Sequence, residues 1–383
     1  MHTPSAHSTM LISVAEEMNP TRRNTMEDAH VIHAPQTWSA PCPSASFIGV
    51  YDGHGGRLIV DYLEDHLANN VAQEWTFGVT GEKEQGRGGG VTVAANAGRK
   101  RRRRADDNDS STSTDEDSDD EDDENDEEET DDDENEIIHN ALERAFLLTD
   151  IQSRMAGLTT SGATVVCTII QPQFDNQGIC TEIHIHAANA GDARAVLSST
   201  VAHSALSAVV KQDTIHHHNY NNNNNTTTTA VRITQDHKST DTSEIQRIEA
   251  VGGTMIRDRV MGILAVARSL GDHGLKEFVI AKPFLSSTVV NIVDCDIVRN
   301  NNNGNGVKAT TSSSSHLYTN GEFLIVACDG LWDVMEDDEA VDAVRDHVAE
   351  NGMSSRTEVA SILVNLALER GSTDNVTVIV YWL

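Results

Sequence analysis

Residues Phe47-Ile48-Gly49-Val50-Tyr51-Asp52-Gly53-His54-Gly55-Gly56 place an apolar, β-rich run directly before an acidic residue and a glycine-rich turn. A carboxylate beside a buried strand costs free energy unless a cation neutralises it. The same pattern recurs at distant positions, where other acidic residues adjoin apolar runs: Glu27-Asp28, Asp192, Asp329 and Asp374. One such carboxylate could belong to a satisfied turn, but the recurrence across the chain predicts a shared cation site.

The negative charge of the chain is concentrated in one segment. The 383 residues carry a net charge of −32, and residues 105–136 hold 21 Asp or Glu and no Lys or Arg. Subtracting that segment from −32 leaves −11 for the rest of the chain. The net charge therefore says little about the folded part.

Cysteine usage and hydropathy indicate the compartment. The five cysteines are widely spaced and form no CxxC pair, which is typical of free thiols and argues against a disulfide framework or a zinc site. No secretory signal is evident, and no run approaches the ~18 apolar residues of a membrane span. We expect a soluble intracellular protein, cytoplasmic and/or nuclear, without membrane contact.

The chain is expected to form a single domain over residues 11–383, interrupted by three disordered insertions. These fall at about 78–136 (basic, then acidic), 212–230 (rich in His, Asn and Thr) and 298–316 (rich in Asn and Ser). Several consecutive strands are separated by short turns, which favours antiparallel sheets with helices outside, an α+β fold. Periodicity predicts helices from about Gly56 and over 137–155, 339–349 and 358–370, and strands over 29–33, 46–51, 163–170, 182–189, 193–197, 323–328 and 376–382.

The candidate ligands are all oxygen atoms, which favours Mg²⁺ or Mn²⁺ over zinc. Two such ions bridged by one carboxylate would hold and deprotonate a water for in-line displacement at phosphorus. A structural calcium site is the main alternative, but it leaves the glycine turn after Asp52 unexplained. These glycines would let the Gly53 carbonyl approach an ion and would leave His54 exposed to protonate a leaving oxygen. Arg22-Arg23 could bind phosphate or simply pair with nearby carboxylates, and the chemistry alone favours neither.

Seven segments along the chain carry a further pattern: Arg23–His30, Val50–Gly56, Ser161–Thr164, Asn189–Arg194, Leu264–Asp272, Ala327–Val334 and Gly371–Asn375. Together they resemble, in order, the signatures of the protein phosphatase 2C family, the metal-dependent serine/threonine phosphatases. The resemblance covers about Leu11 to Leu383 apart from the three insertions. Any one segment is modest support, but seven in family order are highly specific.

The resemblance implies a fold, a cofactor and a role for each site residue. The fold would be a four-layer α-β-β-α sandwich of two central antiparallel sheets flanked by helices, with two Mg²⁺ or Mn²⁺ ions in a cleft at one edge. Asp52 would bridge the ions, and Arg23 would bind substrate phosphate while His54 acts as general acid. The implied ligands are Asp329 and Asp374 at the first ion, the Gly53 carbonyl with Glu27 and Asp28 at the second, and Asp192, Asp329 and Asp333 at a weaker third.

Three further segments are interpreted with the help of the resemblance. Asp272 follows an apolar run like the metal carboxylates, but the family comparison makes it structural, beside the flap that borders the cleft, so it is left out of the metal set. Residues 236–253 are similar to that flap. His216-His217-His218 is more simply explained as low-complexity sequence than as a metal tract.

The leading functional hypothesis is a protein phosphatase hydrolysing phosphoserine and phosphothreonine monoesters. Its partners would be phosphorylated proteins, among them members of stress-activated kinase cascades, and the protein is expected to be a monomer. The first alternative is a non-catalytic scaffold on the same fold, whose acidic insertion binds basic proteins. The second is a binuclear phosphohydrolase acting on small phosphomonoesters. Residues 99–104 are a candidate nuclear import signal, whereas nucleic-acid binding is disfavoured by the acidic residues downstream.

Overall fold

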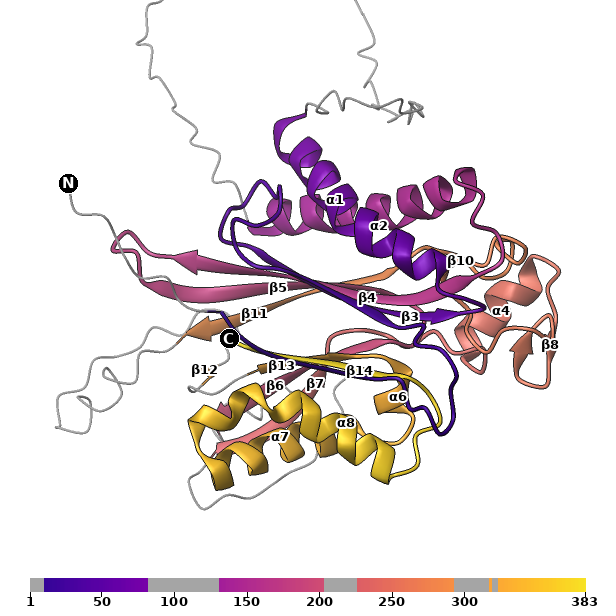
Figure 1. Cartoon of the computed structure of the whole chain (residues 1–383). Helices are drawn as coiled ribbons and strands as arrows, with labels where there is room; N and C mark the ends of the chain where they lie inside the picture. Colours follow the sequence, from indigo (N-terminus) through magenta and orange to yellow (C-terminus); the bar gives the residue numbers. More distant parts are fainter. Residues whose placement is uncertain (1–9, 82–130, 203–225, 293–316, 319–322) are drawn as a thin grey trace, which may run out of the picture.

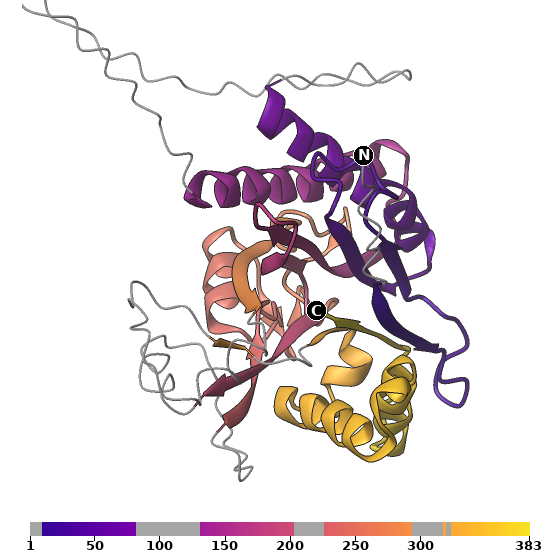
Figure 2. The same cartoon turned by 90° about the vertical axis from the view of Figure 1, so that its left-hand side faces the viewer.

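Two β-sheets pack face to face, and helices cover their outer faces (Figure 1). The computed structural model describes residues 10–81, 131–202, 226–292, 317–318 and 323–383. Helices α1 and α2 lie on one side of the pair of sheets and α7 and α8 on the opposite side, as both views show (Figures 1 and 2). The expected α+β class and its α-β-β-α layering are confirmed.

The first sheet has five strands in the order β1-β14-β13-β6-β7, all antiparallel. Its centre is β13, whose five residues are all buried because the other sheet covers one face and helices the other. The bounds are β1 Leu11–Glu17, β6 Arg194–Ala202, β7 Thr226–Arg232, β13 Phe323–Ala327 and β14 Val376–Trp382.

The second sheet follows the order β12-β11-β5-β4-β3-β2, and β10 also pairs with β4. All its pairings are antiparallel except β11 with the two-residue strand β12. The bounds are β2 Ala29–His33, β3 Ser46–His54, β4 Gly162–Phe174, β5 Cys180–Ala190, β10 Leu270–Gly271, β11 Phe284–Ile292 and β12 Leu317–Tyr318.

The helices complete the outer layers. α1 (Leu58–Thr80) and α2 (Asp131–Met155) cover the second sheet, and α6 (Asp329–Trp332), α7 (Asp337–Asn351), the 3-10 turn Met353–Thr357 and α8 (Val359–Glu369) cover the first. Between the sheets lies a third apolar layer built mainly of Ile, Val, Leu and Ala. α4 (Thr242–Ala250) and the hairpin β8–β9 (Met255–Ile256, Arg259–Val260) project at one end and carry a small core of their own.

Several predicted bounds differ from the structure. α2 begins at Asp131, inside the expected insertion, and Glu134 accepts a hydrogen bond from Gln171 Nε2 of β4 at 2.9 Å. Acidic residues suit a helix N-terminus because of its dipole. Thr226–Thr229, expected in an insertion, form the first half of β7, as the strand preference of β-branched residues allows. Strands β1 and β11 were not expected. α1 runs to Thr80 and is capped by Gly81, so the first expected insertion also begins later than predicted. Most of the remaining insertion residues, 99–104 and 216–218 among them, lie outside the described residues.

The remaining expectations concern cysteines and membranes. Cys42, Cys167, Cys180 and Cys328 are free thiols, and Cys167 and Cys328 are buried. Within the described ranges, no helix is long and apolar enough to cross a membrane.

Candidate metal and phosphate site

The carboxylates singled out by sequence meet at one end of the paired sheets. Glu27 and Asp28 precede β2, Asp52 lies near the end of β3, and Asp192 follows β5. From the other sheet, Asp329 follows β13 as the first residue of α6, and Asp374 precedes β14. Electrostatic coupling joins the set: Asp28, Asp192, Asp329 and Asp374 all raise the pKa of the Asp52 carboxyl. The structure thus brings together residues that are up to 347 positions apart in sequence.

Burial makes this cluster unfavourable without cations. Burial first, and then the neighbouring carboxylates, raise the pKa of Asp52 and of Asp192 well above the usual range. Burial and the charges of Asp329 and Asp374 raise the pKa of Asp28 to about 7, although hydrogen bonds from Thr377 and Cys328 act in the opposite direction. Burial, with Asp333 and Asp374, raises the pKa of Asp329 to about 6. Carboxyl groups whose ionised form is disfavoured in this way provide sites for cations.

Two protein cations contact the outer members of the cluster. Arg23 forms a hydrogen bond and ion pair with Asp374, and its Nε donates to the carbonyl of Thr373 at 3.2 Å. Lys238 Nζ lies 2.7 Å from Asp333 Oδ1. Among the described residues, no three His, Cys, Asp or Glu lie in an arrangement that would hold one metal ion.

The residues nevertheless fit divalent cations. The donors are carboxylate and carbonyl oxygens, which Mg²⁺ and Mn²⁺ prefer. Asp192 is 6% exposed, and its Oδ1 has no hydrogen-bond partner among the residues that the structure describes. A buried carboxylate oxygen without a donor is costly, and a metal ion would satisfy it.

The glycine turn after Asp52 is shaped by close backbone contacts. A Cβ at Gly53 would lie 2.4 Å from the carbonyl oxygen of Glu27, so only glycine fits there. Gly55 and Gly56 have φ of +71° and +107°, a region that favours glycine. The Gly56 N–H donates to Glu27 Oε2 at 3.2 Å, which holds this carboxylate over the turn.

His54 has a carboxylate partner that sequence reasoning did not assign to it. Its Nε2 lies 2.7 Å from Asp272 Oδ2, which also accepts from Ser269 Oγ at 2.5 Å. Burial would raise the pKa of Asp272, but the contacts with His54, Ser269 and Lys276 hold it below the usual value. The exclusion of Asp272 from the metal set stays a prediction. The sequence analysis expected a structural role for Asp272 beside the flap but did not predict its contact with His54. A Cβ on Gly162 would overlap the Asp272 carboxylate, at 2.1 Å from Oδ2, so Gly162 leaves the space this carboxylate fills.

Other positioning residues were not anticipated. The Asn375 side chain accepts from the Glu27 N–H at 2.8 Å and donates to the carbonyls of Met18 and Thr25 at 2.8 and 3.0 Å. Arg57 Nη1 donates to the carbonyl of Asp28 at 2.6 Å, anchoring the same acidic segment to the start of α1. Asn375 ends one of the recognised segments and Arg57 directly follows another, but no pattern in the sequence indicates which backbone atoms they bind.

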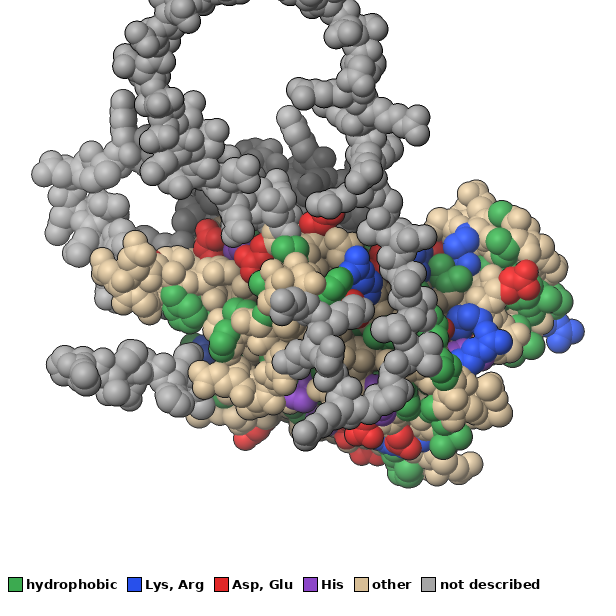
Figure 3. All heavy atoms as spheres, turned by 90° about the horizontal axis from the view of Figure 1, so that it is seen from above, with side chains coloured by type: hydrophobic (Ala, Val, Ile, Leu, Met, Phe, Trp, Pro, Cys, Tyr) green, Lys and Arg blue, Asp and Glu red, His purple; other side chains and the backbone are tan. Residues whose placement is uncertain are grey.

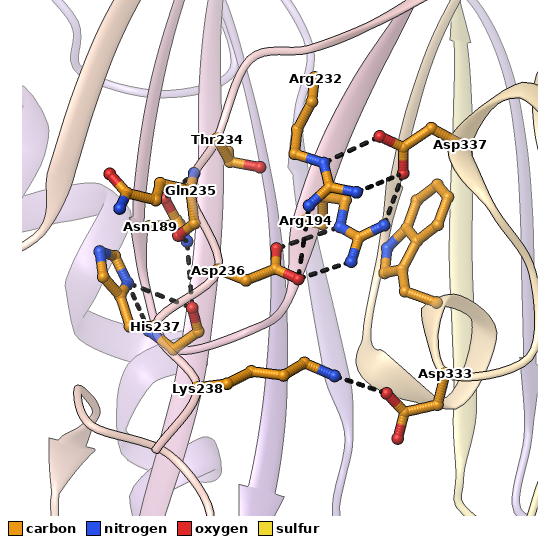
Figure 4. Close-up of polar contacts among 12 residues, drawn as sticks. Asn189, Arg194, Arg232, Thr234, Gln235, Asp236, His237, Lys238, Asp333 and Asp337 are labelled. Carbon is orange, nitrogen blue, oxygen red and sulfur yellow. Dashed lines mark hydrogen bonds and ion pairs between the residues drawn. The ribbon is translucent and has the colours of Figure 1, made fainter. Parts of the chain in front are cut away.

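A buried ionic network lies beside the outer carboxylates (Figure 4). Arg194 is 5% exposed and pairs with Asp236 and Asp337 at 2.5 Å each. Arg232 Nε also contacts Asp337, at 2.8 Å, and the Arg194 guanidinium lies 5.0 Å from the centre of the Trp332 ring. Each charge has an opposite partner, as buried charges require. The network joins β6 and β7 to α7 and to the segment that carries Lys238.

Comparison with known proteins identifies relatives of this chain. The family model described as "Protein phosphatase 2C" matches residues 92–376. The chain is 28% identical over 98% of its length to "Protein phosphatase 2C homolog 1" of Schizosaccharomyces pombe, covering 74% of that protein. It is 39% identical over 40% of its length to the protein of the same name from Saccharomyces cerevisiae, covering 43% of it. The chain spans less than two thirds of that relative and of several others, such as "Protein phosphatase 1B" of Homo sapiens (54%).

A solved structure supports the fold. The chain resembles the "serine-threonine phosphatase 2C from Toxoplasma gondii" with a TM-score of 0.57 and 16% identity, covering 99% of this chain and 97% of that one. At this identity the likeness concerns the fold alone. The match of the family model over most of the chain confirms the resemblance found in the sequence and the expected enzyme class, protein serine/threonine phosphatase. The chain belongs to the protein phosphatase 2C family.

Proposed function

We propose that the protein hydrolyses phosphoserine and phosphothreonine monoesters with two Mg²⁺ or Mn²⁺ ions held by the carboxylate cluster. The observation that carries the proposal is the buried set of Asp28, Asp52, Asp192 and Asp329, whose pKa values are all raised. Such a set is costly in a folded protein unless divalent cations occupy it. When bound, two such ions lower the pKa of a water and neutralise charge at a phosphoryl group.

We assign each carboxylate a ligand role from its place in the cluster. Asp52 lies at the centre of the coupled carboxylates and would bridge the ions. Asp329 and Asp374, both from the first sheet, would hold the first ion. The Gly53 carbonyl, Glu27 and Asp28 would hold the second, directly or through water. A weaker third ion would be held by Asp192, Asp329 and Asp333.

Arg23 and His54 would handle the substrate. Arg23 is half exposed and borders Asp374, so its guanidinium can turn to a pair of phosphate oxygens. His54 lies at the end of β3, two residues after Asp52, and its ring is oriented by Asp272. In this position it would donate a proton to the serine or threonine oxygen as the ester bond breaks.

The surface near the site suits a phosphorylated protein. Seen from the side of α1 and α2, Lys and Arg side chains gather toward the end of the molecule where α4 and β8 lie (Figure 3). Arg257 and Arg259 of the hairpin β8–β9 are exposed there. Cations at this end would attract an anionic substrate. This supports an anionic, phosphorylated substrate. Stress-kinase substrates, a monomeric state and cytoplasmic or nuclear localisation stay predictions.

The test is a comparison of substrates. Phosphoserine, phosphothreonine and phosphotyrosine versions of one peptide are incubated with the full chain in Mn²⁺, in Mg²⁺ or in EDTA, and released phosphate is measured. The proposal predicts metal-dependent release from the first two peptides and little from the third. Release of phosphate only from small phosphomonoesters would support the second alternative, and no release from any substrate would support the scaffold.

A further inference from the structure

Lys238 stands at the outer edge of the carboxylate cluster, where the proposed third ion would bind. Its ammonium lies 2.7 Å from Asp333 Oδ1, as Figure 4 shows, and the two side chains are 39% and 55% exposed. Lys238 is also close enough to Asp192 for their opposite charges to attract each other. One ammonium therefore faces two of the three carboxylates assigned to the third ion.

The backbone of Lys238 is fixed relative to Asp192. The N–H of His237 donates to the carbonyl of Gly191 at 2.9 Å, and His237 is fully buried. The Asn189 side chain donates to the carbonyl of Gln235 at 2.6 Å and accepts from the N–H of the same residue at 3.2 Å (Figure 4). The turn that carries Asp192 and the segment that carries Lys238 are thus held side by side.

A second set of contacts holds Lys238 from its other side. The residue forms an isolated antiparallel bridge with Val266, and the N–H groups of Ser239 and Ala267 bond to Ala265 and His237 at 2.9 and 2.8 Å. Asp236 is fixed by its pairing with the buried guanidinium of Arg194. Because its backbone is fixed on both sides, the Lys238 ammonium is held within reach of Asp333.

The carboxylate set also has a feature that points to a cation other than Lys238. Asp192 is 6% exposed, and no described residue donates a hydrogen bond to its Oδ1, so the ammonium on Asp333 does not satisfy this oxygen. A divalent ion shared by the carboxylates would satisfy it, but an ammonium and a divalent ion repel each other at this separation. Each cation would therefore weaken the binding of the other to Asp333.

We propose that Lys238 is a built-in competitor of the third metal ion: its ammonium neutralises the outer carboxylates when the third ion is absent and must leave Asp333 before that ion binds. The inference rests on the proposed function, because it assumes that the inner carboxylates hold two ions. It identifies Lys238 as a residue that lowers the affinity for the third ion. It also couples that ion to the segment leading into α4, since the Lys238–Asp333 pair ties this segment to the residue that follows α6.

The test measures Mn²⁺ binding rather than activity. Calorimetric titration of the metal-free full chain is compared for the wild type, Lys238→Met and Lys282→Met. The last variant removes the same charge from an exposed lysine that pairs with Glu143 at 3.2 Å. We expect the weakest Mn²⁺ site to bind about five- to tenfold more tightly in Lys238→Met, and the other ions to be unchanged within about twofold in both variants. Addition of Asp333→Asn to Lys238→Met should abolish the gained affinity.

Chemical labelling supplies a second measurement. The extent of amine acylation at Lys238, followed by mass spectrometry, should rise with Mn²⁺ at the concentration that fills the weakest site, while labelling at Lys282 stays constant. Unchanged or weaker third-site affinity in Lys238→Met, no third site in that variant, or labelling of Lys238 that does not respond to Mn²⁺ would each overturn the inference. None of these results affects the two tighter ions, so failure of the proposed function is recognised separately, by the absence of those two ions.

Discussion

The imidazole of His54 and the carboxylate of Asp272 form a hydrogen-bonded pair, with 2.7 Å between Nε2 and Oδ2. The carboxylate is itself held by Ser269 Oγ, and its backbone N–H donates to the carbonyl of Ser161 at 3.0 Å. The pair joins the end of β3 to the loop that follows β10, residues that are 218 positions apart. Asp272 therefore fixes the ring orientation of the residue proposed as general acid.

The first prediction concerns this orientation. Asp272→Asn should lower kcat about tenfold on a phosphoserine peptide, because a misoriented His54 protonates the serine oxygen poorly. The loss should be less than about threefold on p-nitrophenyl phosphate, whose leaving group needs little protonation. Steady-state kinetics on both substrates measure the difference.

Two further variants separate orientation from general damage. His54→Asn should show the same dependence on leaving group, and adding Asp272→Asn to it should cost little more, because the two residues act as a unit. Equal losses on both substrates, or additive losses in the double variant, would mean that Asp272 serves only the fold.

The second prediction concerns Arg23. Arg23→Ala should raise KM for a phosphopeptide about tenfold while kcat changes less than about threefold, because the guanidinium contributes to phosphate binding in both ground and transition states. Arg22→Ala removes an adjacent exposed charge and is the matched control, with an expected change in KM of less than about twofold. A similar KM effect in both variants would indicate general electrostatic attraction instead of a specific contact.

The third prediction concerns Asn375, which is 3% exposed and joins β14 to the segment before β2 through three side-chain hydrogen bonds. Asn375→Ala should lower the free energy of unfolding by about 2–4 kcal/mol, because buried backbone groups lose their partners. Asn69→Ala is the control: this side chain is exposed and bonds only within α1, to the Asp65 carbonyl, so its loss should cost about 0.5 kcal/mol or less. Urea denaturation gives both values, and equal costs would contradict the assigned role of Asn375.

The fourth prediction concerns pH in the absence of metal. Burial raises the pKa of Asp28 from 3.8 to about 7 and that of Asp329 from 3.8 to about 6. Between pH 4 and 7 the folded state therefore binds more protons than the unfolded chain, so these groups favour folding at low pH and this contribution is lost as pH rises through 6 and 7. Divalent cations replace the protons, so stabilisation by Mg²⁺ should grow with pH.

Thermal unfolding measures this effect. The difference in Tm between samples in Mg²⁺ and in EDTA should be on the order of 5 °C larger at pH 8 than at pH 5.5. The contributions of other titrating groups to Tm largely cancel in this difference, because both samples contain them. The variant Asp28→Asn should show a smaller change with pH. Stabilisation by Mg²⁺ that is independent of pH would contradict the raised pKa values.

The sequence predicted the parts of the molecule that depend on local pattern. Strands 29–33 and 376–382 have the predicted bounds, and the fold class and family are confirmed. Thr226–Thr229 were misassigned because a run of one residue type looks like low complexity, although threonine favours strands. Strand β1 was missed because its pairing with β14 joins the two ends of the chain.

Contacts within the site were harder to predict than its members. Periodicity and spacing identify acidic residues beside strands, but the partners of Asp272 and Asp333 come from other segments. Gly162 is a case in point: its need for glycine depends on the Asp272 carboxylate, 110 residues later in the chain. Likewise, nothing near Lys238 in sequence indicates that its ammonium reaches α6. Such contacts depend on how the two sheets pack, which local pattern does not encode.

The central claim is that Asp52 joins two divalent ions that drive hydrolysis of phosphoserine and phosphothreonine esters. Its most direct test is phosphate release from a phosphoserine peptide as a function of Mn²⁺, for the wild type, Asp52→Asn and the exposed control Asp65→Asn in α1. The account predicts saturable Mn²⁺-dependent release that EDTA abolishes, a loss of at least about 10³-fold in folded Asp52→Asn, and normal turnover in Asp65→Asn. Wild-type protein without metal-dependent release, or Asp52→Asn with wild-type turnover, would contradict it.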